Sequence, residues 1–203
     1  MRVISGTFRS RSLQAPRGTA TRPTSDRLRE TLFNVLGPRV VGARFADLYA
    51  GSGAVGIEAA SRGATTVYFS ETAPSALAAI RTNLTSLNLR PGMQIEAGGT
   101  AVLLRKLKAS TERTPGNTLG GLDVVFLDPP YEAAEEYLKT LTTLGSGDLL
   151  SPAALVVAEH TRREPLQHRY GILQRTRTLL QGDAALSFYS PATNEDTPEP
   201  LGK

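Results

Sequence analysis

The chain has 203 residues, of which 40% are hydrophobic and 21% are charged. This length and balance fit one soluble globular unit with a full core, and no run approaches the roughly 18 apolar residues of a membrane span. The chain contains no cysteine and two histidines, which excludes disulfides, cysteine nucleophiles and thiolate zinc sites. A histidine-based metal site is not expected either. We therefore expect neither a bound metal nor a membrane partner.

Charge is distributed unevenly along the chain. The net charge is +4, and residues 1–23 contain five arginines and no acid. A basic segment of this kind is a candidate surface for nucleic-acid phosphates, although a merely solvated start explains the charge equally well. The segment lacks the apolar core of a secretory signal, so we expect a cytoplasmic protein.

Residues 1–40 are expected to form an extension of their own. Residues 1–23 alternate enough for a short hairpin followed by a loop. Thr24 or Ser25 can cap a helix, and apolar residues at positions 28, 32, 35 and 36 give that helix one apolar face, with Arg29 off it. The glycine and proline at positions 37 and 38 end the helix.

Strands and helices alternate from residue 41 to residue 190, and residues 191–203 are expected to be a disordered, polar tail. The apolar patterns predict strands at 44–49, 66–70, 93–97, 122–127 and 154–159, helices ending at 63, 87, 108 and 144, and a final antiparallel pair at 170–180 and 184–190. This order predicts an α/β fold, with a mostly parallel sheet, helices on both faces and an antiparallel hairpin at one edge.

A glycine-rich turn follows the first predicted strand. Gly51, Gly53 and Gly56 match the pattern G-x-G-x-x-G, and Glu71 follows at a spacing typical of dinucleotide sites. The glycines permit a tight turn and let a ligand approach the backbone beside a helix N-terminus, so NAD is a rival ligand. Asp47 just before the turn disfavours a pyrophosphate and favours a zwitterionic amino-acid ligand. A purely structural turn with Asp47 as a helix cap also remains open.

The fourth predicted strand ends abruptly at Asp128-Pro129-Pro130-Tyr131. Pro129 holds Asp128 extended, and neither proline can donate to a continuing strand. A carboxylate and a carbonyl that accept the two N–H bonds of a nucleobase amine would localise its lone pair toward an electrophile, and Tyr131 offers a ring for base stacking. A proline-terminated strand whose acid caps the next helix is the alternative. In a doubly wound sheet the first and fourth strands are neighbours, so this motif and the glycine turn should adjoin.

Four segments in this order resemble the bacterial small-subunit (16S) ribosomal RNA guanine-N2 methyltransferase family, the RsmD type. They are residues 2–6 (Arg-Val-Ile-Ser-Gly), 22–34 (Arg-Pro-Thr-Ser-Asp-Arg-Leu-Arg-Glu-Thr-Leu-Phe-Asn), 47–56 with the glycine turn, and 128–131. The resemblance covers about residues 1–190. It implies a class I (Rossmann-like) methyltransferase fold, S-adenosylmethionine as cofactor, and methylation of one guanine of 16S rRNA in the small subunit or an assembly intermediate. We expect the protein to be a monomer.

Residue roles carry over by position from this resemblance. The implied cofactor-binding residues are Asp47, Tyr49, Gly51, Ser52, Gly53, Glu71, Thr72, Gly99 and Thr100; the catalytic ones are Asp128, Pro129, Pro130 and Tyr131; and the RNA-binding ones are Arg9, Arg11, Arg22 and Arg27.

One stretch departs from the family pattern, and several functions remain open. Related enzymes commonly place Asp or Asn after the third strand to bind adenine, but residues 96–101 contain neither, which leaves backbone at Gly99 and Thr100. The alternatives are an adenine-N6 DNA or RNA methyltransferase, a non-catalytic RNA-binding assembly factor on the same fold, and an NAD oxidoreductase.

Overall fold

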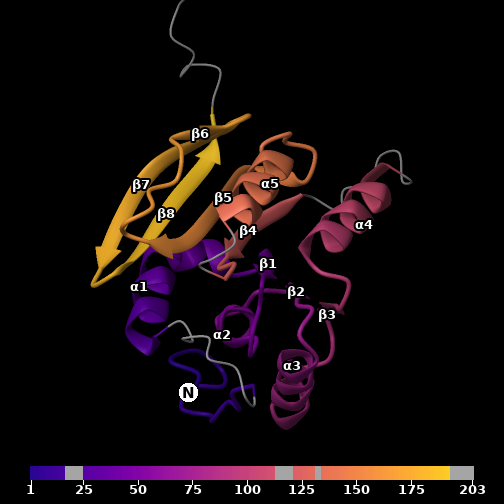
Figure 1. The fold of residues 1–203 in the computed structure, drawn as a ribbon. Helices are drawn as coiled ribbons and strands as arrows, with labels where there is room; N and C mark the ends of the chain where they lie inside the picture. Colours follow the sequence, from indigo (N-terminus) through magenta and orange to yellow (C-terminus); the bar gives the residue numbers. More distant parts are fainter. Residues whose placement is uncertain (17–24, 113–120, 131–133, 193–203) are drawn as a thin grey trace, which may run out of the picture.

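A computed structural model describes residues 1–16, 25–112, 121–130 and 134–192 (Figure 1). The predicted site residues Arg22 and Tyr131 and residues 193–203 of the predicted tail lie outside these residues. The tail was predicted to begin at residue 191, but Pro191 is the last residue of a strand. Within the described part of the chain, no helix is both long and apolar enough to cross a membrane, and no three acidic or histidine side chains are grouped as a metal site would require.

The described strands form one eight-stranded sheet in the order β3-β2-β1-β4-β5-β8-β7-β6. Strands β1 to β5 are parallel, and β5, β8, β7 and β6 pair antiparallel. This confirms the predicted mostly parallel sheet with an antiparallel edge. The bounds are β1 (Arg44–Leu48), β2 (Thr66–Ser70), β3 (Met93–Glu96), β4 (Leu122–Leu127), β5 (Leu150–Thr161), β6 (Arg169–Tyr170), β7 (Leu173–Gln181) and β8 (Ala184–Pro191).

Helices cover both faces of the sheet, and each face has its own core. One core contains side chains of α1, α2 and α3, together with Phe45, Phe69 and Phe126 of the sheet. The other contains side chains of α4 and α5 and the alternate residues of the same strands, among them Leu48 and Leu127. The helices are α1 (Asp26–Leu36), a 3-10 turn (Gly37–Val40), α2 (Ala54–Ser61), α3 (Pro74–Ser86), α4 (Thr100–Glu112) and α5 (Ala134–Leu144).

The C-terminal strands differ from the prediction in two places. Strand β5 starts at Leu150 rather than at residue 154, and a register shift between Leu122 and Val124 accommodates its extra length. The predicted strand 170–180 is broken into β6 and β7 at Gly171, which has φ +57°. A Cβ there would lie 2.2 Å from the Gly145 carbonyl oxygen, so the close approach of the α5–β5 turn requires glycine.

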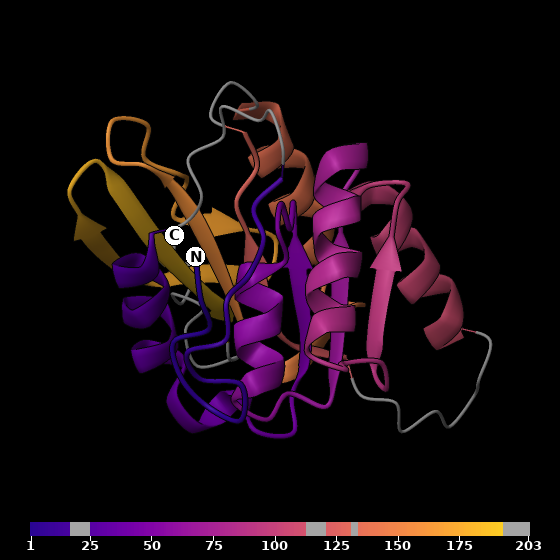
Figure 2. The ribbon, with the colours of Figure 1, turned by 90° about the horizontal axis from the view of Figure 1, so that it is seen from below.

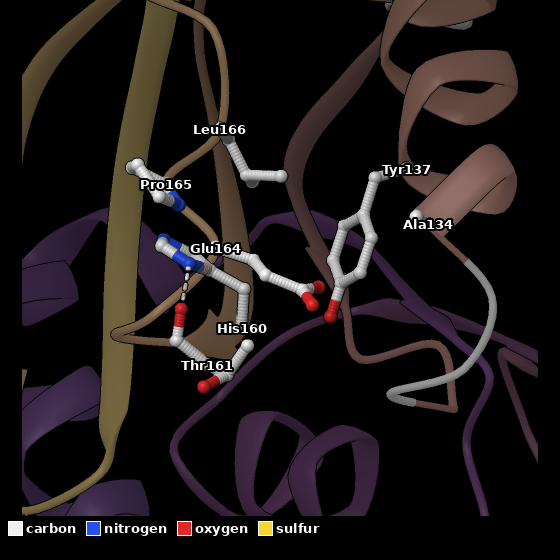
Figure 3. A pocket seen from close by; sticks show the side chains of 7 residues that line it. All are labelled: Ala134, Tyr137, His160, Thr161, Glu164, Pro165 and Leu166. Atoms are coloured by element: carbon white, nitrogen blue, oxygen red, sulfur yellow. Dashed lines mark hydrogen bonds between the residues drawn. The ribbon is translucent and has the colours of Figure 1, made fainter.

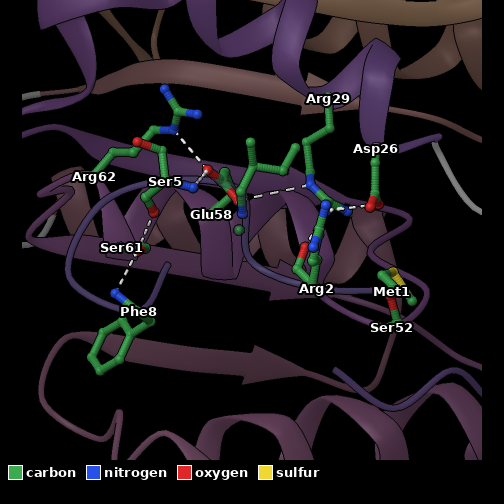
Figure 4. A network of polar contacts seen from close by, with 12 residues as sticks. Met1, Arg2, Ser5, Phe8, Asp26, Arg29, Ser52, Glu58, Ser61 and Arg62 are labelled. Atoms are coloured by element: carbon green, nitrogen blue, oxygen red, sulfur yellow. Dashed lines mark hydrogen bonds and ion pairs between the residues drawn. The ribbon is translucent and has the colours of Figure 1, made fainter. Parts of the chain in front are cut away.

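Residues 1–14 form an N-terminal strap that lies along α2 (Figure 4) and bonds to α3 through Arg11 and Gln14. A bridge between Arg2 and Ser12 gives it the predicted hairpin character. Glu58 of α2 accepts the N–H groups of Ile4 and Ser5 at 2.7 and 2.9 Å. Residues 1–14 are therefore part of the folded unit, because their backbone groups are satisfied by helix side chains.

Helix α1 begins as predicted, with the Ser25 side chain accepting the Leu28 N–H at 3.1 Å. Arg29 departs from the prediction that places it off the apolar face, because its side chain is completely buried. Its guanidinium donates to the Arg2 carbonyl and, at 3.1 Å, to Asp26, and lies 3.8 Å from Glu58. Arg29 thereby joins α1, α2 and the strap, which is a tertiary role that helical periodicity does not reveal.

Candidate active site

The glycine turn and the Asp128 motif meet at the carboxyl ends of neighbouring strands. Leu48 of β1 pairs with Leu127 of β4, and the Asp128 N–H points to the Leu48 carbonyl at 3.4 Å. Strand β1 leads into α2 and strand β4 leads toward α5, and these two helices pack on opposite faces of the sheet. This is the switch point at which open α/β sheets bind ligands, and the predicted adjacency is confirmed.

The glycine turn between β1 and α2 depends on its residue types. Gly51 and Gly53 have φ values of +54° and +76°, a left-handed backbone that glycine adopts at no steric cost. A Cβ on Gly51 would meet nothing within 4 Å, so the turn leaves open space beside its backbone. Gly56 serves packing instead, because a Cβ there would lie 2.4 Å from the Phe69 ring.

Replacing Gly56 with alanine should lower the free energy of unfolding by about 1–3 kcal/mol, the usual cost of overpacking a dense core. Phe69 is fully buried on β2, so an added methyl group on residue 56 would force core side chains or the α2 backbone to shift. Urea denaturation of the variant and the wild type measures the loss. Gly51→Ala is the control, because a methyl group there meets no neighbour and the only strain comes from the positive φ. Equal stability of Gly56→Ala and wild type would contradict the packing role of Gly56.

Asp47 caps α2 from within the core. Its side chain is buried, with 2% of the residue exposed, and its carboxylate accepts the Gly56 N–H at 2.8 Å. Burial raises the pKa of Asp47 to about 8, while the hydrogen bond from Gly56 opposes that change. The geometry matches the helix-cap alternative, and any contact of Asp47 with a ligand stays a prediction.

The raised pKa of Asp47 has a consequence for stability. Between about pH 4, where an unfolded aspartate ionises, and about pH 8, the folded state holds a proton that the unfolded state has released. Stability should therefore fall as pH rises through this window. Asp47→Asn cannot ionise, so its stability relative to wild type should increase from pH 4 to pH 8. Parallel curves of unfolding free energy against pH for the two proteins would contradict the raised pKa.

Glu71 bridges the ends of β1 and β2. Its carboxylate accepts the N–H groups of Gly51 at 2.9 Å, Thr72 at 2.6 Å and Ala73 at 2.8 Å. These bonds fix it beside the open glycine turn, where a half-buried carboxylate can still accept from a diol. Gly99 and Thr100 follow β3, the neighbour of β2. Gly99 has φ +86°, and Thr100 begins α4 with its hydroxyl 3.2 Å from that of Ser70.

These residues fit the cofactor that the sequence implies. The space that a Cβ on Gly51 would enter is open, so an amino-acid moiety could approach the backbone there, and Glu71 is suited to ribose hydroxyls. Gly53 is buried, and its N–H donates to the Ala50 carbonyl at 2.7 Å. Thr72 is exposed at the same edge, whereas Ser52 is buried and accepts an Asn83 N–H through its carbonyl at 3.0 Å. Contact of each of these residues with a cofactor stays a prediction.

Tyr49 turns its side chain away from the glycine turn. Its hydroxyl donates to Glu136 at 3.0 Å and lies 2.9 Å from the Thr140 hydroxyl, both on α5. Its φ of +64° is unusual for a residue with a Cβ, and such strained residues are common at functional sites. Tyr49 therefore links the β1 turn to the helix that follows the Asp128 motif.

Two of the predicted RNA-binding arginines, Arg9 and Arg11, lie apart from this site. Thr7 donates to the Ser61 carbonyl at 2.8 Å, and Arg11 donates to the Ser86 carbonyl at 3.2 Å. Ser61 and Ser86 are the last residues of α2 and α3. The turn with Arg9 and Arg11 therefore lies at the amino ends of the parallel strands, opposite the candidate site. In Figure 2 the parallel strands point to the top and this indigo turn lies at the bottom. Arg27 is exposed in the first turn of α1.

Sequence patterns did not reveal a hollow between α5 and the end of β5 (Figure 3). Its lining residues come from the first turns of α5 and from the end of β5 with the loop that follows; they are Ala134, Tyr137, His160, Thr161, Glu164, Pro165 and Leu166. The available signal was positional, since residues after the fifth strand must emerge at the same edge as Asp128.

Comparisons with known proteins agree with this geometry. A family model described as conserved hypothetical protein 95 matches residues 1–190. YlbH of Bacillus subtilis is 39% identical over 190 residues, covering 93% of this chain and 98% of YlbH. Ribosomal RNA small subunit methyltransferase D of Escherichia coli K12 is 35% identical over 161 residues, covering 78% and 74%. The solved structure of yhhF from Escherichia coli has a TM-score of 0.76 at 30% identity, covering 94% and 97%.

The fold and the paired motifs at its switch point define a class I, Rossmann-like methyltransferase, the class that uses S-adenosylmethionine. Within that class, the chain belongs to the conserved hypothetical protein 95 family, the RsmD type.

Proposed function

We propose that this protein methylates the exocyclic N2 amine of one guanine in 16S rRNA, in the small subunit or an assembly intermediate. The observation that carries the proposal is the position of Asp128, at the carboxyl end of β4 and beside the glycine turn of β1. Support for the substrate comes from relatives named ribosomal RNA small subunit methyltransferase D. S-adenosylmethionine would supply an electrophilic methyl group on a sulfonium.

The chain's own residues act on the amine. The Asp128 carboxylate and the Pro129 carbonyl accept its two N–H bonds and turn the nitrogen lone pair toward the methyl carbon, in a near-attack pose of about 3–3.5 Å. S-adenosylmethionine, once bound, would supply the methyl group to this nitrogen and leave as S-adenosylhomocysteine, and Asp128 would take the extra amine proton at or after transfer. Pro130 keeps this segment rigid, and Tyr131 would stack on the base.

The remaining assignments concern holding the RNA. Residues 1–40 would close the site and bind phosphates, with Arg22 and Arg27 near the target and Arg9 and Arg11 on RNA that extends past the far edge of the sheet. Residues 41–190 would carry the chemistry. We expect a monomer that acts in the cytoplasm.

The test is mass spectrometry of nucleosides from small subunits incubated with the protein and labelled S-adenosylmethionine. The subunits should come from cells that lack the endogenous activity, and naked 16S rRNA and assembly intermediates are run in parallel. Labelled N2-methylguanosine is the expected product. Labelled N6-methyladenosine would replace the guanine assignment with the adenine alternative, and no label on any of these RNAs despite cofactor binding would overturn the enzymatic proposal.

A further inference from the structure

The hollow at the end of β5 lies next to the carboxyl end of β4, where Asp128 is placed. Leu127 of β4 pairs with Ala158 of β5, so Asp128 is level with Glu159, one residue before His160 of the hollow. The opposite wall begins at Ala134, the first residue of α5. A base whose amine reaches Asp128 would therefore extend toward this hollow.

The polar groups of the hollow are already bonded, with one exception. The ring of His160 lies with Nδ1 2.9 Å from the Thr161 carbonyl and Nε2 2.8 Å from the Ser187 hydroxyl, and burial lowers its pKa. The Tyr137 hydroxyl donates to the Glu159 carbonyl at 2.7 Å. Glu164 is exposed, and its carboxylate has no hydrogen-bond or ion-pair partner among the described residues. Figure 3 shows it directed across the hollow toward Tyr137.

The loop that carries Glu164 is held in place by the antiparallel strands. Arg175 of β7 donates to the Leu166 carbonyl at 2.9 Å, and Tyr189 of β8 donates to the Gln167 carbonyl at 2.8 Å. The Tyr170 hydroxyl accepts the Gln167 N–H at 3.1 Å. These bonds preorganise the position of Glu164, as a site that discriminates between ligands requires.

We propose that Glu164 recognises the N1–H of the target guanine, with the base lying against Ala134, Pro165 and Leu166. This inference rests on the proposed function. A carboxylate only accepts hydrogen bonds, and N1–H is the donor adjacent to the N2 amine on the same edge of guanine. Adenine presents an N1 lone pair at that position, which the carboxylate would repel. Glu164 is thus a specificity residue that favours guanine and rejects adenine-like edges.

The experiment compares guanine with 2-aminopurine at the mapped target, in small subunits reconstituted with either base. 2-Aminopurine keeps the amine but has a lone pair at N1. Wild type should strongly prefer guanine. Glu164→Ala should lower kcat/KM on guanine by about 10–100-fold, the loss of one hydrogen bond to a charged group. The kcat/KM values for the guanine and 2-aminopurine substrates should then be similar. Glu164→Gln, whose amide can donate to N1, should shift preference toward 2-aminopurine.

Controls separate specificity from folding and from the proposed function itself. Glu135→Gln changes an exposed glutamate that does not line the hollow and should keep the wild-type preference. Affinity for S-adenosylhomocysteine should be the same in all variants. An unchanged guanine preference in Glu164→Ala, or an equal loss on both bases, would overturn this inference while leaving the proposed function intact. Failure of wild type to methylate guanine in any substrate would overturn both.

Discussion

Replacing Asp128 with alanine should lower the rate of methyl transfer by about 10²–10³-fold, the typical loss when a preorganised transition-state partner is removed. The carboxylate is half-exposed at the end of β4, where it can accept from a bound amine. Its removal leaves the backbone of the glycine turn in place. Single-turnover transfer from labelled S-adenosylmethionine measures the rate, and calorimetry with S-adenosylhomocysteine should show unchanged affinity.

Two further variants sharpen the Asp128 experiment. Asp128→Asn keeps an oxygen acceptor but cannot take the proton, so it should retain more activity than Asp128→Ala. Asp148→Ala removes an exposed acid paired with Lys108, away from the site, and should be as active as wild type. Wild-type turnover in Asp128→Ala would refute the assignment of Asp128 as the amine acceptor.

The fold could be predicted wherever local pattern and tertiary partner agree. Strands β2 and β4 have the predicted bounds because each is a short apolar run ended by turn-forming residues. The start of β5 was missed because Pro152 interrupts its apolar run, yet the register shift at β4 allows pairing back to Leu150. The break at Gly171 depends on the approach of Gly145, which no local pattern contains.

In the candidate site, too, some features could be predicted from the sequence and others could not. The adjacency of the glycine turn and Asp128 follows from sheet topology, which strand–helix alternation predicts. The fully buried state of Asp47, the turn of Tyr49 toward α5 and the hollow at Glu164 depend on side chains packed from distant elements. Helical periodicity placed Arg29 outside the core because a charged side chain is assigned to the solvent-exposed face of a helix. In the structure, Glu58 and the Arg2 carbonyl of the strap interact with its guanidinium, so that it can be buried.

Glu58 of α2 should be among the side chains most important for stability. Its residue is fully buried, and its carboxylate accepts from Ile4, Ser5 and, at 2.8 Å, Arg62. Glu58→Ala would leave two backbone N–H groups unpaired and the Arg29 guanidinium buried without its nearest α2 partner. The free energy of unfolding should fall by about 3–5 kcal/mol, the usual cost of removing one partner of a buried ion pair, as measured by urea denaturation.

Arg29→Met tests whether the stability lost in Glu58→Ala comes from the Glu58 carboxylate itself or from its ion pair with Arg29. Burial lowers the pKa of Arg29, opposed by Asp26 and Glu58, and its Nε and Nη1 atoms make no hydrogen bond to the described residues. The cation is therefore poorly compensated, while Glu58 would keep three donors in its absence. Arg29→Met should lose less than half as much stability as Glu58→Ala, and hydrogen exchange should show residues 1–14 losing protection chiefly in Glu58→Ala. A larger loss in Arg29→Met would mean that the guanidinium, rather than the carboxylate, holds the strap to α2.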